Sequence, residues 1–203
     1  MGEFFRKGDI GERVNKLAPA IGNHDGGSPD GFDLAFSANA DDLLRYFVRR
    51  VGESEGSDLL AETWIRAQRS REAFRGEWRS ARPWLFGVAR HVLAEHWQAV
   101  RQVASNGDTP FDPWPEVDAA IVAEAAGPLL KRALASLEAR DREVLLLHAW
   151  EYLTPQEIAK VLEIRPGTAR SRLHRARKQL RAYEALAASD EPQVGATIRE
   201  EEA

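Results

Sequence analysis

Residues 154–181 read TPQEIAKVLEIRPGTARSRLHRARKQLR and contain the strongest structural signal in the chain. The first four letters form a capping box, in which Thr154 and Glu157 can each bond the backbone of the other. Pro155 occupies the first helical position, where its missing N–H is tolerated. A short connection, EIRPG, then leads into a longer and strongly basic helix. A capped short helix, a tight turn and a second helix predict a helix-turn-helix motif.

The second helix of this motif has an apolar side and a basic side. Ala159 and Ala169 are small enough to let the two helices cross closely. A helix fits the major groove of DNA, where Arg can bond guanine with two hydrogen bonds or hold a phosphate. A solvated basic helix packed in a bundle is the alternative interpretation. The residues from which we expect DNA contacts are Arg165, Thr168, Arg170, Ser171, His174, Arg175 and Arg177.

The charge of the chain is strongly segregated, although its net value is only −4. Residues 165–181 carry six Arg and one Lys without any acid, whereas residues 103–127 carry five acids without Lys or Arg. Such segregation indicates that different surfaces meet different partners. The alternative is that both stretches are solvated and bind nothing.

Helical patterning also covers residues 32–102, which we predict to form a small helical domain. Apolar residues from Phe32 to Val51 recur at spacings that suit one or two helices, and Gly52 is a plausible stop. Asp58 is a plausible N-cap for the next helix. The helices expected here cover residues 32–51, 58–69 and 83–100.

A second helical domain is predicted over residues 128–186, so the fold class is all-α with two small domains joined by a flexible linker. Residues 103–127 form the acidic linker, because their Gly and Pro residues oppose a continuous helix. Residues 1–31 and the acidic tail, residues 187–203, have the composition of disordered segments. The helices expected in the second domain are 128–139, 141–152, the short capped helix from Pro155, and 166–186.

Two further patterns in the first domain suggest binding surfaces. Residues 74–84, FRGEWRSARPW, interleave Arg with aromatic rings, which suits the stacking of unpaired bases. Trp84 is better explained as a core residue. The second pattern is a set of charged residues spaced four apart, which share one helical face: Asp58, Glu62 and Arg66. This face is either a docking surface for a partner or only a ladder of ion pairs along the helix.

These motifs together resemble the sigma factors of bacterial RNA polymerase. Residues 167–181, GTARSRLHRARKQLR, with Thr154, Glu157, Ile158 and Ala159 before them, are similar to region 4 of that family. Residues 58–67, DLLAETWIRA, and residues 84–90, WLFGVAR, are similar to region 2. The matches cover about two thirds of the chain, in the family order, and place it with the small extracytoplasmic-function (ECF) type of the sigma-70 family.

The resemblance implies a function and a set of partners. Region 4 would read the −35 promoter element through the seven residues named for the basic helix, and region 2 would read the −10 element and aid promoter melting. The implied partners are core RNA polymerase (its beta-prime clamp helices and beta flap), promoter DNA and an anti-sigma factor. The residues implied for the −10 element are Arg75, Trp78, Arg79, Ser80, Arg82, Arg90 and His91, and those for core polymerase are Asp58, Leu59, Glu62, Thr63 and Arg66.

The chain departs from the family pattern at three positions. Ala169 stands where Val is frequent, which is a mild change. His91 and Glu95 stand where the family has Asn and Asp, and this predicts an atypical −10 preference.

Other function classes find little support in the sequence. No HExxH, P-loop, nucleophile elbow or dinucleotide fingerprint is present, and His91 and His96 are five residues apart rather than four, so we expect no enzyme, metal or cofactor. The chain has no Cys and no long apolar run, which favours a cytoplasmic protein without membrane insertion. A stand-alone regulator with a helix-turn-helix is the remaining competitor, and it would bind a palindromic operator without polymerase.

Overall fold

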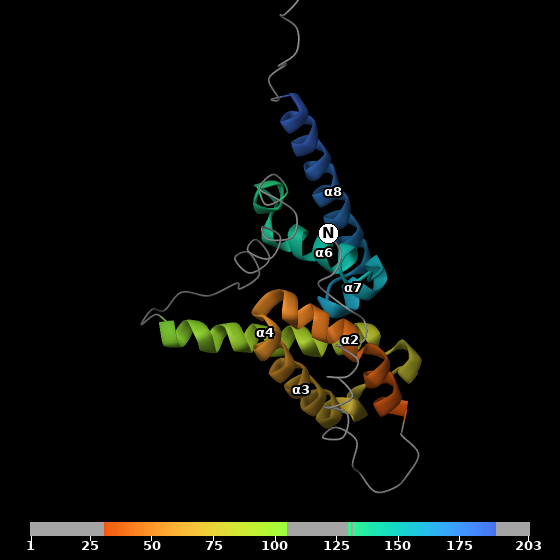
Figure 1. The fold of residues 1–203 in the computed structure, drawn as a ribbon. Helices are drawn as coiled ribbons and strands as arrows, with labels where there is room; N and C mark the ends of the chain where they lie inside the picture. The colour runs from red at the N-terminus through yellow and green to blue at the C-terminus, as the bar shows by residue number, and fades with distance from the viewer. Residues whose placement is uncertain (1–30, 105–129, 131, 190–203) are drawn as a thin grey trace, which may run out of the picture.

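The computed structural model describes residues 31–104, 130 and 132–189, and every regular element in these ranges is helical. The all-α prediction is therefore confirmed. Figure 1 shows two groups of helices, α2 to α4 in the lower part and α6 to α8 in the upper part. The elements are α2 (Gly31–Val51), α3 (Glu53–Ser70), α4 (Arg82–Ala104), α6 (Ala139–Ala149), α7 (Pro155–Val161) and α8 (Pro166–Ser189), with 3-10 turns at Arg71–Ala73 and Trp78–Ser80.

Three segments were predicted to be disordered or flexible, and all of them lie outside the described residues except at their edges. These segments are residues 1–31, 103–127 and 187–203. The helices continue slightly beyond the predicted domains, because α4 ends at Ala104 and α8 ends at Ser189. In the segment predicted as a helix over 128–139, residues 132–135 are helical, and the chain turns at Ser136–Leu137 before α6.

The first helical unit, α2 to α4, packs around buried aromatic and aliphatic side chains. The apolar spacing predicted for its first helix is confirmed, because Phe32, Phe36, Leu43 and Phe47 are all buried in α2. Trp84 is partly buried and packs against this core, as expected. Other large buried side chains of the unit are Tyr46, Leu60, Leu85, Phe86 and Leu93.

The start of α3 differs from the sequence-based prediction. The helix begins at Glu53, so the prediction that Asp58 is its N-cap is wrong. Gly52 adopts a φ of 86°, which lets the chain reverse within one residue after α2. Gly56 then lies against the backbone of Val48, where an added Cβ would come within 3.1 Å of the Val48 nitrogen. α3 therefore begins five residues before Asp58, and its first turn packs closely on α2 through Gly56.

The second helical unit contains the predicted helix-turn-helix, α7 followed by α8. Its capping box is present, because the Glu157 N–H donates to Thr154 Oγ1 at 3.3 Å and the Thr154 N–H donates to Glu157 Oε2 at 2.8 Å. Glu163 turns the chain with a φ of 53°, and the Ile164 N–H donates back to the Ala159 carbonyl at 2.9 Å.

The helix before this motif, α6, ends at Ala149 rather than at Tyr152 as predicted. Tyr152 takes a left-handed φ of 54°, which projects its ring into solvent and turns Leu153 into the core. The helical pattern of the sequence predicts that α6 continues to Tyr152. The burial of Leu153 requires the chain to turn earlier, so α6 ends at Ala149.

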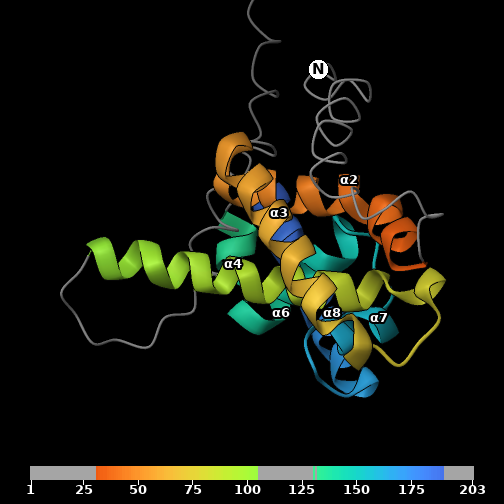
Figure 2. The same ribbon diagram turned by 90° about the horizontal axis from the view of Figure 1, so that it is seen from below.

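The two units pack against each other. Helix α7 lies on α4, and Figure 2 shows α6, α7 and α8 behind the first unit. The buried apolar residues of both units form one continuous cluster. Among the described residues, no helix combines the length and apolar character that a bilayer crossing requires.

Candidate nucleic-acid interface

Helix α8 separates its buried and exposed residues as a recognition helix requires. Ala169 and Ala176 are fully buried and Leu173 nearly so, and this side packs on α6 and α7. Six of the seven residues predicted to contact DNA are exposed, and Thr168 is half-buried at the start of the helix. The exposed ones are Arg165, Arg170, Ser171, His174, Arg175 and Arg177.

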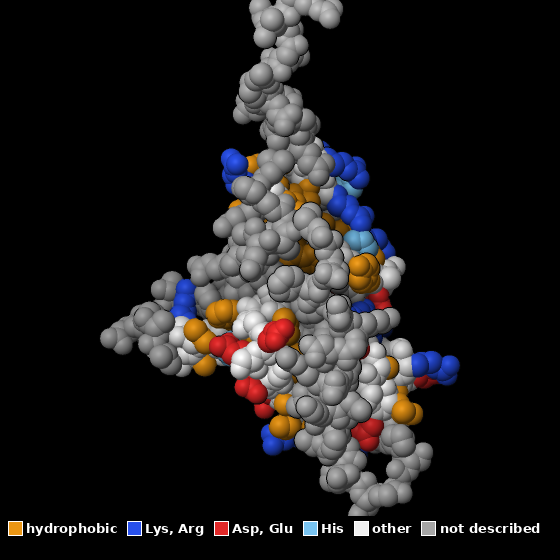
Figure 3. Space-filling view, viewed as in Figure 1, with side chains coloured by type: hydrophobic (Ala, Val, Ile, Leu, Met, Phe, Trp, Pro, Cys, Tyr) orange, Lys and Arg blue, Asp and Glu red, His pale blue; other side chains and the backbone are white. Residues whose placement is uncertain are grey.

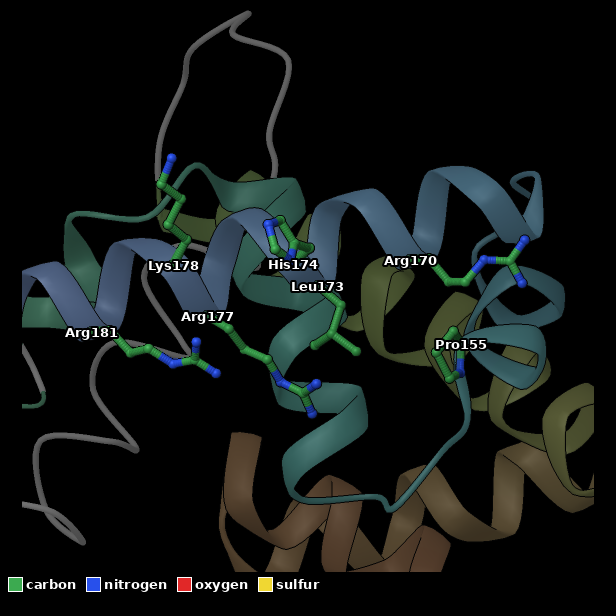
Figure 4. Close-up of a pocket in the computed structure, with 7 residues that line it drawn as sticks. All are labelled: Pro155, Arg170, Leu173, His174, Arg177, Lys178 and Arg181. Carbon is green, nitrogen blue, oxygen red and sulfur yellow. The ribbon is translucent and has the colours of Figure 1, made fainter.

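A shallow basic groove runs along α8 beside the N-terminus of α7. Its volume is about 380 Å³. Figure 4 shows Arg170 beside Pro155 of α7, with Arg177 and Arg181 projecting from the same side of α8. In Figure 3 the Lys, Arg and His side chains gather along the edge of the upper unit. The groove is lined by Pro155, Arg170, Leu173, His174, Arg177, Lys178 and Arg181.

Two cations of this groove, Lys178 and Arg181, were not in the predicted set. They stand four residues after His174 and Arg177, so helical spacing alone places them on the same face. The groove therefore continues the basic surface about three helical turns beyond Arg170.

Arg175 lies outside this groove. Its Nε and Nη2 donate to the two carboxylate oxygens of Asp141 in α6, at 2.9 and 2.8 Å. The hydrogen bonds that Arg175 donates to Asp141 raise the pKa of Arg175 above its ordinary value. Asp141 is buried and Arg175 is exposed, so this pair braces α8 against α6 from its outer edge.

In the first unit, Trp78 belongs to a cluster of aromatic rings. Its ring stacks on Phe74 with centroids 4.9 Å apart and meets Phe32 edge-on at 5.5 Å. Trp84 lies 6.1 Å away. Gly31 makes room for the indole, because a Cβ at that position would lie 2.4 Å from Trp78 Cδ1. The ring is half-buried and held in place, with one part still open to solvent.

The other residues predicted for the −10 element divide into two groups. Arg75, Arg79, Ser80 and His91 are exposed near the aromatic cluster or on α4. Each of these side chains has a partner close to it in the sequence. Arg75 donates a hydrogen bond to the Glu72 carbonyl, and Arg79 forms an ion pair with Glu77. Ser80 donates to the Glu77 carbonyl, and His91 Nδ1 lies 2.9 Å from the Gly87 carbonyl oxygen.

Arg82 and Arg90 form the second group, because both contact the second helical unit. Arg82 donates to the Glu151 carbonyl at 2.9 Å and pairs with Asp42 at 2.7 Å. Arg90 pairs with Glu143 of α6 at 2.7 Å.

The residues predicted to contact core polymerase lie together on α3, but not all of them reach the surface. Asp58 is exposed, and Glu62 and Arg66 are partly exposed, while Thr63 is fully buried and Leu59 nearly so. The hydroxyl of Thr63 donates to the Leu59 carbonyl at 2.7 Å, so these two residues support the helix from within.

Arg66 also joins α3 to α4. It pairs with Glu62 at 2.6 Å and with Glu95 at 2.7 Å. The hydrogen bond from Arg66 lowers the pKa of Glu95, and the two carboxylates raise the pKa of Arg66. Glu95, which the sequence marked only as a departure from the family pattern, thus has a structural partner.

Within the described residues, no group of three or more His, Asp or Glu side chains is placed to hold a metal ion. The arrangement as a whole is that of a helix-turn-helix DNA-binding protein with a second helical unit.

Comparisons with known proteins define the family. Residues 129–180 match the model "Sigma-70, region 4" and residues 35–102 match "Sigma-70 region 2". The ECF RNA polymerase sigma factor SigL of Mycobacterium tuberculosis is 34% identical over 142 residues, covering 68% of this chain and 80% of the relative. The ECF RNA polymerase sigma factor SigC of the same species is 32% identical over 175 residues, covering 84% and 91%. The chain therefore belongs to the sigma-70 family, among the ECF sigma factors of transcription initiation.

Solved structures include a weaker likeness. The sigma factor RpoE from Bartonella quintana, determined with the anti-sigma factor NepR, gives a TM-score of 0.47 at 20% identity, over 75% of this chain and 93% of that one.

Proposed function

We propose that α8 reads the −35 promoter element from the major groove. The observation that carries this proposal is the groove on α8, in which Arg170, His174 and Arg177 face solvent together while the opposite side of the helix is buried. Residues near the start of such a helix reach base edges, and cations further along hold phosphates. Arg170 is therefore assigned to base contact, and Lys178 and Arg181 are assigned to the DNA backbone.

The first unit is proposed to engage the −10 element and to aid its melting. A sigma factor separates the strands without ATP, so captured bases must offset an unpairing cost of a few kcal/mol per flipped base. Trp78 is half-buried and held by Phe32 and Phe74, which leaves a rigid ring beside the exposed Arg75 and Arg79. Stacking on such a ring is worth about 1–3 kcal/mol per base.

The face of α3 that carries Asp58, Glu62 and Arg66 is proposed to dock on the beta-prime clamp helices of core polymerase. Its support is the exposure of Asp58 and the partial exposure of the two other side chains on one helix. The second unit is proposed to meet the beta flap. In this role the chain is a binding subunit and performs no catalysis of its own.

The −35 proposal is tested by footprinting the holoenzyme assembled from this chain and core polymerase. Arg170→Ala is expected to cost about 1–3 kcal/mol of promoter binding and to relax discrimination at one −35 base pair. Arg140→Ala is the matched control, because Arg140 is exposed on α6 and does not line the groove. Equal footprints for the Arg170 variant and the parent protein would contradict the proposal.

A further inference from the structure

The connection between α6 and α7 exposes a large aromatic side chain. Tyr152 is 82% exposed, although its two neighbours in the chain, Glu151 and Leu153, are buried. Within the part of the chain that the structure describes, the ring and hydroxyl of Tyr152 make no hydrogen bond or ring contact. The fold therefore gains little from this side chain, because its stabilisation by burial is small.

The backbone holds Tyr152 in an unfavourable conformation. Its φ of 54° lies in the left-handed region, which glycine adopts freely and a bulky residue adopts only at a cost. Leu153 fixes this conformation, because its side chain is fully buried and its N–H donates to the Leu147 carbonyl at 3.2 Å. The Leu153 carbonyl oxygen also lies 2.8 Å from His148 Nδ1. A strained residue that is fixed by its surroundings and open to solvent is typical of a binding site.

Tyr152 lies close to the basic groove of α8. Pro155 lines this groove and follows Tyr152 by three residues, so their Cα atoms are at most about 11 Å apart. Figure 4 shows Pro155 beside Arg170, where the connection from α6 enters α7. A helix with its side chains is about 10–12 Å wide and fills a major groove about 12 Å wide. When α8 occupies the groove, the segments that flank α8 therefore face the bordering phosphates.

Few hydrogen-bond donors are free at this edge of the groove. The N–H and the hydroxyl of Thr154 both donate to Glu157 Oε2, at 2.8 and 2.7 Å. Pro155 has no N–H, and the Glu157 carboxylate repels a phosphate. In this part of the described chain, the exposed side chains with a free donor are those of Tyr152 and Gln156. Of these two, only Tyr152 has a left-handed backbone that holds its side chain in solvent.

We infer that the Tyr152 hydroxyl donates a hydrogen bond to a DNA phosphate that borders the −35 element. Tyr is among the side chains that bond phosphate oxygens, and such contacts fix the register of a protein on the duplex without reading its bases. Tyr152 therefore positions α8, while Arg170 contacts base edges. The inference rests on the function proposed for α8, and it adds an uncharged contact to the cations of the groove.

Promoter binding by holoenzyme, assembled from the full chain and core polymerase, tests this inference. The DNA is a promoter fragment identified by run-off transcription. Tyr152→Phe removes only the hydroxyl and is expected to weaken binding about tenfold. A phosphate contact is independent of sequence, so the same factor should apply to fragments with altered −35 bases.

Tyr183→Phe is the matched control for this measurement. Tyr183 stands two residues after Arg181, which places it on another side of α8, and it does not line the groove. Tyr183→Phe should therefore bind the promoter like the parent protein. Equal promoter binding by Tyr152→Phe and the parent protein would overturn the inference.

The bonded phosphate is located by replacing single phosphates that border the −35 element with neutral methylphosphonate groups. At one position, the replacement should weaken binding of the parent protein. The same replacement should have a clearly smaller effect on Tyr152→Phe, because the hydrogen bond is already lost. Equal effects on the two proteins at every position would contradict a contact between Tyr152 and a phosphate.

Tyr152→Gly separates a role in binding from a role in the fold. Glycine adopts the observed φ freely, so the midpoint of thermal unfolding should not fall, while promoter binding should weaken as it does in Tyr152→Phe. Glu163→Gly is the control for the backbone, because Glu163 is also exposed and has a φ of 53°. This control should not weaken binding. A lowered midpoint in Tyr152→Gly would assign the side chain to the fold and refute the inference.

Arg170→Ala distinguishes failure of this inference from failure of the proposed function. If Arg170→Ala leaves the −35 footprint unchanged, the function proposed for α8 is contradicted and the phosphate contact with it. If Arg170→Ala alters the footprint and Tyr152→Phe binds like the parent protein, only the contact of Tyr152 is refuted.

Discussion

Replacement of Trp78 separates its two roles, as part of a core and as a stacking surface for DNA. The indole contacts Phe32, Phe74 and Trp84 with ring centroids between 4.9 and 6.1 Å. Trp78→Ala therefore removes three aromatic contacts, while Trp78→Phe keeps a ring in the cluster.

The expected loss of stability follows from burial. A fully buried Trp or Phe replaced by Ala costs about 3–5 kcal/mol, and aromatic pairs add about 0.5–1.5 kcal/mol each beyond area. Trp78 is only half-buried, so we expect Trp78→Ala to lower the free energy of unfolding by about 2–3 kcal/mol. Trp78→Phe should lower it by less than about 1.5 kcal/mol, because volume and ring character are largely retained.

Urea unfolding followed by circular dichroism measures the stability, and anisotropy with a forked −10 promoter DNA bound to holoenzyme measures the binding. A lost base stack of about 1–3 kcal/mol corresponds to a roughly 5- to 150-fold weaker complex for Trp78→Ala. An Ala variant as stable as the parent protein would refute the packed cluster. If Trp78→Phe and Trp78→Ala both fold stably and both bind the −10 promoter DNA as tightly as the parent protein, the stacking role is refuted.

Three further predictions concern other contacts. Thr154→Ala should destabilise the second unit by about 1 kcal/mol through loss of the capping box, measured by thermal unfolding, and an unchanged midpoint would contradict the cap. Asp58→Arg should prevent co-elution with core polymerase while leaving the helical content intact, and normal co-elution would exclude this docking face. The hydrogen bond from Arg66 lowers the pKa of Glu95, so this contact stabilises the fold above the ordinary pKa of a Glu side chain and is lost as pH falls through the lowered pKa. The stability difference between the parent protein and Glu95→Gln should therefore shrink on acidification, and a constant difference would contradict the ion pair.

The sequence predicts the local elements of this protein well, because their signals are local. The capping box at Thr154, the small Ala169 and the stop at Gly52 each act within a few residues. The start of α3 was missed because it depends on Gly56 meeting the Val48 backbone on another helix. The end of α6 was missed for a similar reason, since the burial of Leu153 determines it.

The candidate site shows the same division between local and long-range information. Helical spacing predicted the exposed face with Arg170, His174 and Arg177, and the same rule applied further would have added Lys178 and Arg181. The pairing of Arg175 with Asp141 spans 34 residues, and that of Arg82 with the Glu151 carbonyl spans 69. Spacing along one helix carries no information about such partners.

Run-off transcription tests the central claim most directly. Core polymerase from the organism that encodes this chain would transcribe fragments of its genome with and without the purified protein, and the 5′ ends of the products would be mapped. We predict a discrete set of start sites that appears only with the protein and weakens with Arg170→Ala. Identical start sites in the presence and absence of the protein would contradict a role in promoter selection.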